Sequence, residues 1–490
     1  MNFVNLIQPK KGLNLPLKDL PNLKTQRRKK QASASMNPTR ICGADTETVN
    51  GKVWLFSTEY GVWEIKSLKD LFTVFFNKFH RSSWKQGKGK GQKTTHGYTT
   101  KEYFFWNLKF DAQAIFKLDD FTDEEIDKII DGEKVRVSTD FGFIDVKYLE
   151  GKFLMMQPVN IFMNGRRIGK VLWWDISQFY NKMRLNDASK LFLKSEKVEF
   201  CFDGSKLDAS KFDDDEYRDY YREDIEKYAV QDAVLTGELA RMRREDFVSQ
   251  GVRFIMPYSV ANVAQRNMLD LCKIPTMNVI KKDENGLAII QRFLSSYQGG
   301  WFTTSGSGFF PNCIGVDLVS AYPYVMYHLP DITKGTWIRG NCQSSFENWL
   351  DRRKPLSLGC AEVYAVFEEG LPFYPLVKPT KKGTMVGARI VKGWFTADEI
   401  SEARKWPHSK FKIGEWVKFE AEEIYPLRPF VERFYNMKMT SVKDSVPYIV
   451  SKLCLNSGYG KLIQCISGNI GQLWNPMLAS VCTGATRSRL

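Results

Sequence analysis

Hydrophobic positions recur along this chain with two different periods. The segment Ile314–Leu318 alternates hydrophobic residues with Gly and Asp, which predicts a buried strand that ends near Asp317. A second short strand is predicted at Ile41–Thr48, where acids again occur near the end. Hydrophobic residues that suit a helix lead into Lys452–Gly460, and a helix is also expected over Tyr221–Leu235.

The remaining patterned segments predict a mixture of strands and helices. Tyr103–Ile115 begins as an aromatic strand and continues as a helix. The 135 positions between Asp317 and Lys452 are too many for a simple connection, so a folded insertion is expected there. Within it we predict strands at Ala361–Phe367 and Arg389–Phe395, and amphipathic helices at Thr396–Trp406 and Pro429–Met437. Residues 41–250 are expected to form an α/β domain.

Length and charge restrict the class of protein further. The 490 residues suffice for two to four domains with a large core. The 71 Lys and Arg against 56 Asp and Glu give a net charge of +15, which favours polyanionic partners. Residues 1–40 contain nine basic residues and one acid. A basic arm that contacts nucleic acid backbone, a transit peptide and a solubilising tail are the alternatives for this segment.

Residue usage argues against several other kinds of site. The nine Cys are scattered without a C-x-x-C pair, so we expect reduced thiols in a cytosol-like compartment and no zinc site. Only four His are present, which argues against His-based catalysis. Apolar runs are interrupted well before about 18 residues, so no transmembrane helix and no membrane partner are expected.

Acidic residues on three segments of the α/β domain suggest metal chemistry. Asp45 and Glu47 are two apart on a predicted strand and therefore point to one face. Together with Asp111 and Asp232 they can enclose two Mg²⁺ ions about 4 Å apart, which activate a water and stabilise the leaving oxygen of a phosphodiester. Tyr228 lies one helical turn before Asp232 and can position that water.

A second group of candidate residues suits a nucleotide. Asp317 precedes a turn, where a carboxylate can hold Mg²⁺ and backbone N–H groups can meet phosphate. Lys452, Asn456 and Tyr459 recur at steps of three to four residues and share one helix face. That face offers a cation, an amide and a phenol ring, which suit a triphosphate and a base. An ordinary solvated helix face is the alternative.

A pair of adjacent glycines offers a third binding element. Ser296–Phe302 reads S-Y-Q-G-G-W-F. Gly299 and Gly300 allow backbone to come close to a phosphate. Tyr297 and Trp301 can stack on sugar or base, although aromatic packing around a Gly-Gly turn would give the same pattern.

Together these segments resemble the motifs of family B DNA polymerases. Asp317–Pro323 (D-x-x-S-x-Y-P) and Lys452–Gly460 (K-x-x-x-N-S-x-Y-G) resemble motifs A and B, in that order. The D-x-E, N-x-x-F-D and Y-x-x-x-D elements that contain Asp45, Asp111 and Asp232 resemble the Exo I, Exo II and Exo III motifs of the family's proofreading 3′–5′ exonuclease.

Further elements follow in the family's order. Ser296–Phe302 resembles the Y-x-G-G motif, and Thr483–Arg487 resembles T-x-x-G/A-R with Thr486 in place of the small residue. The long insertion after Asp317 is typical of the protein-primed subgroup. The resemblance thus extends over roughly residues 41–490.

This resemblance implies an α/β and α+β multidomain fold, with a ribonuclease-H-like 3′–5′ exonuclease domain, a partial palm with an inserted subdomain, helical fingers and no thumb. The expected divisions are a basic extension at 1–40, an exonuclease domain at 41–250, a first palm segment at 251–328, a terminal-protein-region-like insertion at 329–426, fingers at 427–465, and a shortened second insertion with the start of the returning palm at 466–490.

The resemblance also implies roles for individual residues. The implied metal ligands are Asp45, Glu47, Asp111 and Asp232 in the exonuclease site, and Asp317 with the Leu318 carbonyl in the polymerase site. Tyr228 would orient the attacking water, and Asn107 and Phe110 would contact the frayed 3′ end. The implied template contacts are Tyr297, Gly299 and Gly300, and Thr483 and Arg487 are further implied substrate-binding residues. The implied nucleotide contacts are Ser320, Tyr322, Lys438, Lys452, Asn456, Ser457, Tyr459 and Gly460.

Three assignments stay open at this point. Ser177 either binds single-stranded DNA or caps a helix. Lys194 and Lys197 are both candidates for the exonuclease site's Lys. Lys438 suits either a triphosphate or an exposed helix surface.

The implied function is that of a DNA-directed DNA polymerase with a 3′–5′ exonuclease, which replicates DNA by protein priming. The implied cofactor is Mg²⁺, with Mn²⁺ as an alternative, and the implied partners are primer-template and single-stranded DNA, dNTPs and a terminal protein. The expected location is the cytoplasm of a host cell, or a mitochondrion for a linear organellar plasmid. The family's motif C, Y-x-D-T-D, does not occur after residue 323. An exonuclease-only chain and an inactive DNA-binding chain are therefore alternative functions. A fragment, a split protein and a decayed gene would each explain the missing motif.

Overall fold

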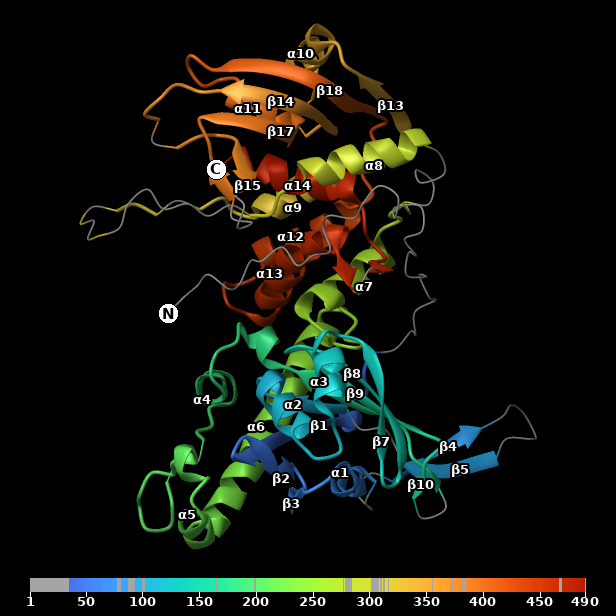
Figure 1. The fold of residues 1–490 in the computed structure, drawn as a ribbon, viewed down its shortest axis with the longest axis vertical. Coiled ribbons are helices and arrows are strands. Elements are labelled where there is room, and N and C mark those ends of the chain that lie inside the picture. Colours follow the sequence, from blue (N-terminus) through green and yellow to red (C-terminus); the bar gives the residue numbers. More distant parts are fainter. Residues whose placement is uncertain are drawn as a thin grey trace. The chain divides into compact units, whose positions relative to one another are not determined.

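The computed structural model describes residues 35–76, 81–86, 93–98, 102–163, 166–197, 200–275, 277, 284–300, 308, 311, 313–315, 317–354, 356–371, 373–379, 385–466 and 469–489. Most of the predicted basic arm, together with Trp301 and Val316, lies outside these residues. The chain separates into two compact units at Val263 and Ala264 (Figure 1). The finer division into domains stays a prediction.

The unit Ser33–Val263 is built on a mixed eight-stranded sheet among its described residues, in the order β3-β2-β1-β6-β12-β9-β8-β7. The neighbours β1, β6 and β12 are parallel, and the outer strands pair antiparallel. The strands are β1 (Ile41–Val49), β2 (Lys52–Thr58), β3 (Gly61–Glu64), β6 (Glu102–Phe105), β7 (Lys134–Thr139), β8 (Gly142–Leu149), β9 (Phe153–Val159) and β12 (Val171–Asp175). Two separate hairpins are β4 (Arg81–Gln86) with β5 (Lys93–Tyr98) and β10 (Phe162–Met163) with β11 (Arg166–Arg167).

Helices of this unit carry several of the candidate residues. They are α1 (Leu68–Phe75), α2 (Leu108–Phe116), α3 (Asp123–Ile130), α4 (Leu185–Ala188), α5 (Asp215–Tyr220) and α6 (Arg222–Ser249). The long helix α6 packs directly on β1. A Cβ at Gly43 would lie only 1.8 Å from the Ala233 carbonyl oxygen, so glycine at this position permits the close approach. This approach brings the face of α6 that carries Asp232 to the strand that carries Asp45.

An aromatic core packs together side chains of β2, β6 and β12. The rings of Phe105 and Trp173 lie 4.3 Å apart between centroids, and Phe56 stacks on Trp173 at 5.7 Å. All three side chains are fully buried. The predicted strand at Ile41–Thr48 and the aromatic strand that leads into a helix are therefore both confirmed.

The unit that contains Ala264–Leu490 combines a four-stranded antiparallel sheet with packed helices. Its sheet has the order β13-β18-β14-β17, with β13 (Gly335–Gly340), β14 (Gly359–Val366), β17 (Ile390–Thr396) and β18 (Lys410–Ala421). Two smaller strand pairs are β15 (Val377–Pro379) with β16 (Met385–Gly387) and β19 (Cys465–Ile466) with β20 (Asn469–Ile470). The helices are α7 (Val260–Leu271), which begins before the boundary, α8 (Glu284–Ser296), α9 (Ala321–His328), α10 (Gln343–Arg352), α11 (Ala397–Ala403), α12 (Arg428–Thr440), α13 (Val446–Gly458) and α14 (Pro476–Arg487).

The folded insertion is confirmed in detail. The two predicted strands are β14 and β17, and the two predicted amphipathic helices are α11 and α12. The helix expected through Lys452 is α13, which continues as a 3₁₀ turn at Tyr459–Ile463. None of the helices in the described part of the chain is long and apolar enough to cross a membrane.

The strand predicted at Ile314–Leu318 is wrong. Among the described residues of this segment none belongs to a strand, and the side chains of Ile314 and Leu318 are 88% and 40% exposed. An alternating pattern yields a buried strand only where a neighbouring strand pairs with the backbone and a second layer covers the apolar face. No strand of the described residues pairs with this segment, so its pattern alone does not produce one.

Candidate active site

The structure brings the four predicted exonuclease acids into one cluster, in which Asp45 is half-buried and the other three are buried. Asp45 and Glu47 lie on β1, Asp111 on the first turn of α2 and Asp232 on α6. Burial raises the pKa of Asp45 well above its ordinary value, and the charges of the other three acids raise it further. Such mutual repulsion requires the carboxylates to lie close together.

The electrostatics of this cluster disfavour ionisation without a cation. Burial is the main cause that raises the pKa of Glu47 to about 8, that of Asp111 to about 7 and that of Asp232 to about 6. These three side chains are 8%, 2% and 5% exposed. A bound divalent ion reverses the effect, because it stabilises the charged carboxylates.

Two of the acids already have partners from the protein. Thr46 donates its hydroxyl to Asp111 Oδ1 at 2.8 Å. Lys197 Nζ lies 2.5 Å from Asp232 Oδ2, donates to the Tyr228 hydroxyl at 2.5 Å and lies 4.0 Å from the centre of that ring. Although burial opposes its charge, Asp232 and Tyr228 raise the pKa of Lys197 above its ordinary range.

The donor set fits a hard divalent ion in its chemistry. Four carboxylates supply the oxygen ligands that Mg²⁺ prefers, and Asp232 Oδ1 is buried without a hydrogen-bond partner. Within the described part of the chain, no three Asp, Glu, His or Cys side chains already lie in a geometry that could hold a metal ion.

The structure places only one of the two candidate lysines in this cluster. Lys194 is exposed, in a left-handed conformation at the end of the helical turn Ser189–Leu193. Lys197 contacts Asp232 and Tyr228. The sequence alone carried no signal to separate them, because the two lysines are three positions apart in an irregular segment.

The residues predicted to contact a DNA end differ in accessibility. Asn107 is exposed and adopts a left-handed conformation (φ 69°) before α2, and Phe110 is 53% exposed. Ser177 is 4% exposed and donates its hydroxyl to Asp175 Oδ1 at 2.6 Å. The hydroxyl of Ser177 is therefore engaged within the protein.

Sequence reasoning missed Asp175 as a member of this neighbourhood. It is 4% exposed at the end of β12, and its charge contributes to the raised pKa of Asp111. The available signal was its position at the end of a fully buried strand, β12, which pairs with β6, the strand before the Exo II-like segment.

The second candidate site lies in the other unit, where four distant motifs converge on a group of tyrosines. The rings of Tyr322 and Tyr459 stack at 3.9 Å between centroids with an interplanar angle of 4°. Burial raises the pKa of Tyr297, and both Cys482 and Tyr322 lie close enough to raise it further. The helices that carry these residues pack together, since α9 contacts both α13 and α14.

The predicted nucleotide-binding residues surround this group with accessible polar atoms. Lys438 Nζ donates to Ser320 Oγ at 3.1 Å, and Ser320 adopts a left-handed conformation (φ 55°) directly before α9. Further residues are exposed on the same elements or beside them: Asp317, Leu318, Lys452, Asn456 and Gly460. Ser457 is half-buried.

Arg487 contacts the backbone of the predicted template-binding segment, whereas Thr483 bonds within its own helix. Gly299 and Gly300 are exposed, and Arg487 donates to the Gln298 carbonyl and, at 2.7 Å, to the Gly299 carbonyl. Thr483 is 3% exposed, and its hydroxyl donates to backbone carbonyls inside α14. In this structure Thr483 is therefore part of the helix interior, whereas the glycine pair is accessible.

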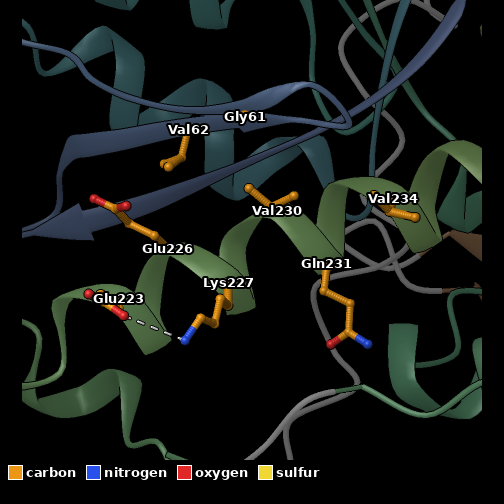
Figure 2. A pocket seen from close by; sticks show the side chains of 8 residues that line it. All are labelled: Gly61, Val62, Glu223, Glu226, Lys227, Val230, Gln231 and Val234. Atoms are coloured by element: carbon orange, nitrogen blue, oxygen red, sulfur yellow. Dashed lines mark ion pairs between the residues drawn. The ribbon is translucent and has the colours of Figure 1, made fainter.

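A surface groove lies along α6 beside the edge strand β3 (Figure 2). None of the four clustered acids lines it, although Lys227 and Gln231 come directly before Tyr228 and Asp232 in the chain. The lining residues are Gly61, Val62, Glu223, Glu226, Lys227, Val230, Gln231 and Val234.

Comparison with known proteins identifies the family. The model of the family described as "DNA polymerase type B, organellar and viral" matches residues 93–467. The chain therefore belongs to the type B DNA polymerases of organelles and viruses.

Curated relatives are distant and longer. A probable DNA polymerase of Ascobolus immersus is 27% identical over 289 residues, which are 56% of this chain and 21% of that protein. The DNA polymerase of Acidianus bottle-shaped virus is 23% identical over 350 residues, which are 67% of this chain and 50% of that protein. The chain thus spans half or less of the length of these two relatives.

Solved structures share the fold. Phi29 DNA polymerase complexed with primer-template DNA superposes with a TM-score of 0.50 at 16% identity, over 90% of this chain and 74% of that chain. The orthorhombic crystal form of the same polymerase gives a TM-score of 0.52 at 14% identity, over 91% and 75%. The mixed α/β fold is therefore that of a phi29-like polymerase over most of the chain.

Proposed function

We propose that the unit Ser33–Val263 is a ribonuclease-H-like 3′–5′ exonuclease. The observation that carries this proposal is the meeting of Asp45, Glu47, Asp111 and Asp232 from three segments in one buried cluster. Acids with such raised pKa values are typical of functional sites. When bound there, divalent ions supply an activated water and stabilise the departing oxygen.

The protein's own groups then orient the reactants. Lys197 holds the Tyr228 hydroxyl beside Asp232, where the hydroxyl positions a water for attack on the terminal phosphodiester. Phe110 and Asn107 are accessible at the start of α2 and hold the last base and sugar of a frayed 3′ end, the aromatic ring by stacking.

We further propose that Ala264–Leu490 binds primer-template DNA and a dNTP as the palm, insertion and fingers of a DNA polymerase. Support comes from the convergence of Tyr297, Tyr322, Tyr459 and Cys482 from four separate segments of the chain. Lys438 and Lys452 neutralise the triphosphate, Asp317 with the Leu318 carbonyl contributes to an Mg²⁺ site, and the Tyr322 ring excludes a ribose 2′-OH.

The ligands of the structurally similar polymerase are compatible with this assignment. The phi29 polymerase was solved with primer-template DNA, with single-stranded DNA and with incoming nucleotides. For this chain we propose the same ligand classes, with priming from a terminal protein.

The test uses the full chain and 5′-labelled oligonucleotides. With Mg²⁺ or Mn²⁺, single-stranded DNA should shorten from its 3′ end, and the Asp45→Ala/Glu47→Ala double variant should lose that activity. An Asp213→Asn variant, which changes an exposed acid outside the cluster, is the matched control. Shortening that persists in the double variant contradicts the proposed site. Shortening without dNTP incorporation on a primer-template identifies the exonuclease-only alternative.

A further inference from the structure

Arg487 takes part in a buried network with Glu399, a residue that no sequence motif singled out. Its side chain is 7% exposed and pairs with Glu399, which is 5% exposed. Both Nη2 and Nε donate to Glu399 Oε1, at 2.6 and 3.1 Å. The remaining terminal nitrogen, Nη1, donates to the carbonyls of Gln298 and Gly299. One arginine thus joins the inserted subdomain to the glycine pair.

The position of Glu399 is fixed by the start of α11. Thr396 donates its backbone N–H and its hydroxyl to Glu399 Oε2, at 3.1 and 2.8 Å, in a capping box. Both oxygens of the carboxylate are therefore engaged. A Cβ at Gly484 would lie 2.4 Å from Thr396 Oγ1 and 2.9 Å from Glu399 Oε2, so glycine at this position lets α14 approach the cap.

The geometry of the peptide bond determines where the N–H groups next to this network point. In a trans peptide the C=O and the following N–H point in opposite directions. Because Arg487 binds the carbonyls of Gln298 and Gly299, the N–H groups of Gly299 and Gly300 point away from Arg487. Both glycines are exposed, and within the described part of the chain neither N–H has a hydrogen-bond partner. Each of these accessible donors can hydrogen-bond to a phosphate oxygen.

We propose that Glu399 is a positioning residue for nucleic acid binding. It holds the Arg487 guanidinium, which in turn holds the carbonyls that orient the Gly299 and Gly300 N–H groups toward a phosphate of the DNA backbone. The inference rests on the proposed function for its DNA partner, whereas the positioning itself is a property of the free chain. The inserted subdomain therefore preorganises a DNA contact that it does not itself make.

The experiment measures hydrogen exchange and DNA affinity separately. We expect Glu399→Gln to raise amide exchange in a peptide that contains residues 297–300 by about tenfold, because a charge-assisted pair is lost. Affinity for a primer-template oligonucleotide at fixed salt should fall by a similar factor. Glu402→Gln, on the same helix but at the surface with Lys405 as its partner, should change neither. Arg487→Lys keeps a cation but loses the planar fork, and should reproduce the exchange of Glu399→Gln in a folded chain.

A double-mutant cycle separates positioning from a general packing effect. If Glu399 acts through Arg487, adding Glu399→Gln to Arg487→Met should cost no further affinity. Additive losses, or unchanged exchange in Glu399→Gln, overturn the proposal. If Glu399→Gln raises the exchange as expected but the wild-type chain binds no primer-template, the proposed function of this unit is refuted and the positioning role stays supported.

Discussion

Neutralising one acid of the exonuclease cluster should stabilise the protein in the absence of divalent ions. The change is Glu47→Gln, which keeps the shape of the side chain and removes its charge. In the folded chain burial and the neighbouring Asp232 raise the pKa of Glu47 from 4.5 to about 8. The native state therefore binds this proton more tightly than the unfolded state does. The contribution of Glu47 to the unfolding free energy is therefore most favourable below pH 4.5. It falls as the pH rises from 4.5 to 8 and reaches its lowest value above pH 8.

The magnitude follows from the same two values. At pH 7.5 the linkage relation gives a destabilisation of roughly 4 kcal/mol for a group that titrates at 4.5 unfolded and about 8 folded. The neighbouring acids share part of this repulsion, since coupled groups titrate together. We therefore expect Glu47→Gln to raise the unfolding free energy of this unit by about 2 kcal/mol at pH 7.5, and by much less at pH 5.

The assay is hydrogen exchange of the β1 amides in increasing guanidinium, with EDTA present, at pH 5 and pH 7.5. It reports the unfolding free energy of the sheet unit separately from the rest of the chain. Adding Mg²⁺ should stabilise the wild type more than Glu47→Gln, because only the wild type keeps the complete set of acids. Equal or lower stability of the variant at pH 7.5, or an unchanged dependence on pH, would refute the reasoning.

Three further predictions concern single contacts. Lys197→Met should lower the rate of single-stranded DNA shortening by about 100-fold and raise the pH at which Asp232 ionises, whereas Lys194→Met should retain the wild-type rate; equal rates for the two variants in a gel assay contradict the Lys197 assignment. Gly484→Ala should destabilise its unit by about 2 kcal/mol in guanidinium unfolding, because overpacking outweighs the helix preference of Ala; a more stable variant would be inconsistent with the close approach of α14 and α11. Phe110→Ala should weaken binding of single-stranded DNA by about tenfold in fluorescence anisotropy, and unchanged affinity would exclude stacking there.

Much of the local structure was predictable because it depends on neighbours in the sequence. The predicted elements around Asp45, Asp111, Asp232 and Lys452 all appear in the structure, and so do the strands and helices of the insertion. Period-two and period-3.6 patterns determine which face an element buries. The order of the polymerase and exonuclease motifs likewise needed only the sequence.

Tertiary packing decided the rest. It selected Lys197 over Lys194, added Asp175 to the acid cluster, and buried Ser177 and Thr483. These outcomes depend on which elements approach each other, and a one-dimensional pattern does not record that approach.

The two clearest cases are Ile314–Leu318 and Glu399. The segment Ile314–Leu318 has a strand pattern and forms no strand, because backbone hydrogen bonds and cover must come from another segment. Glu399 has the sequence context of an ordinary helix-surface acid and is buried, because a glycine on α14 allows two helices to meet around it. The sequence by itself therefore determined most of the elements and the chemical groups that they carry, whereas only the close contacts between segments decided whether Ile314–Leu318 forms a strand and which groups act together.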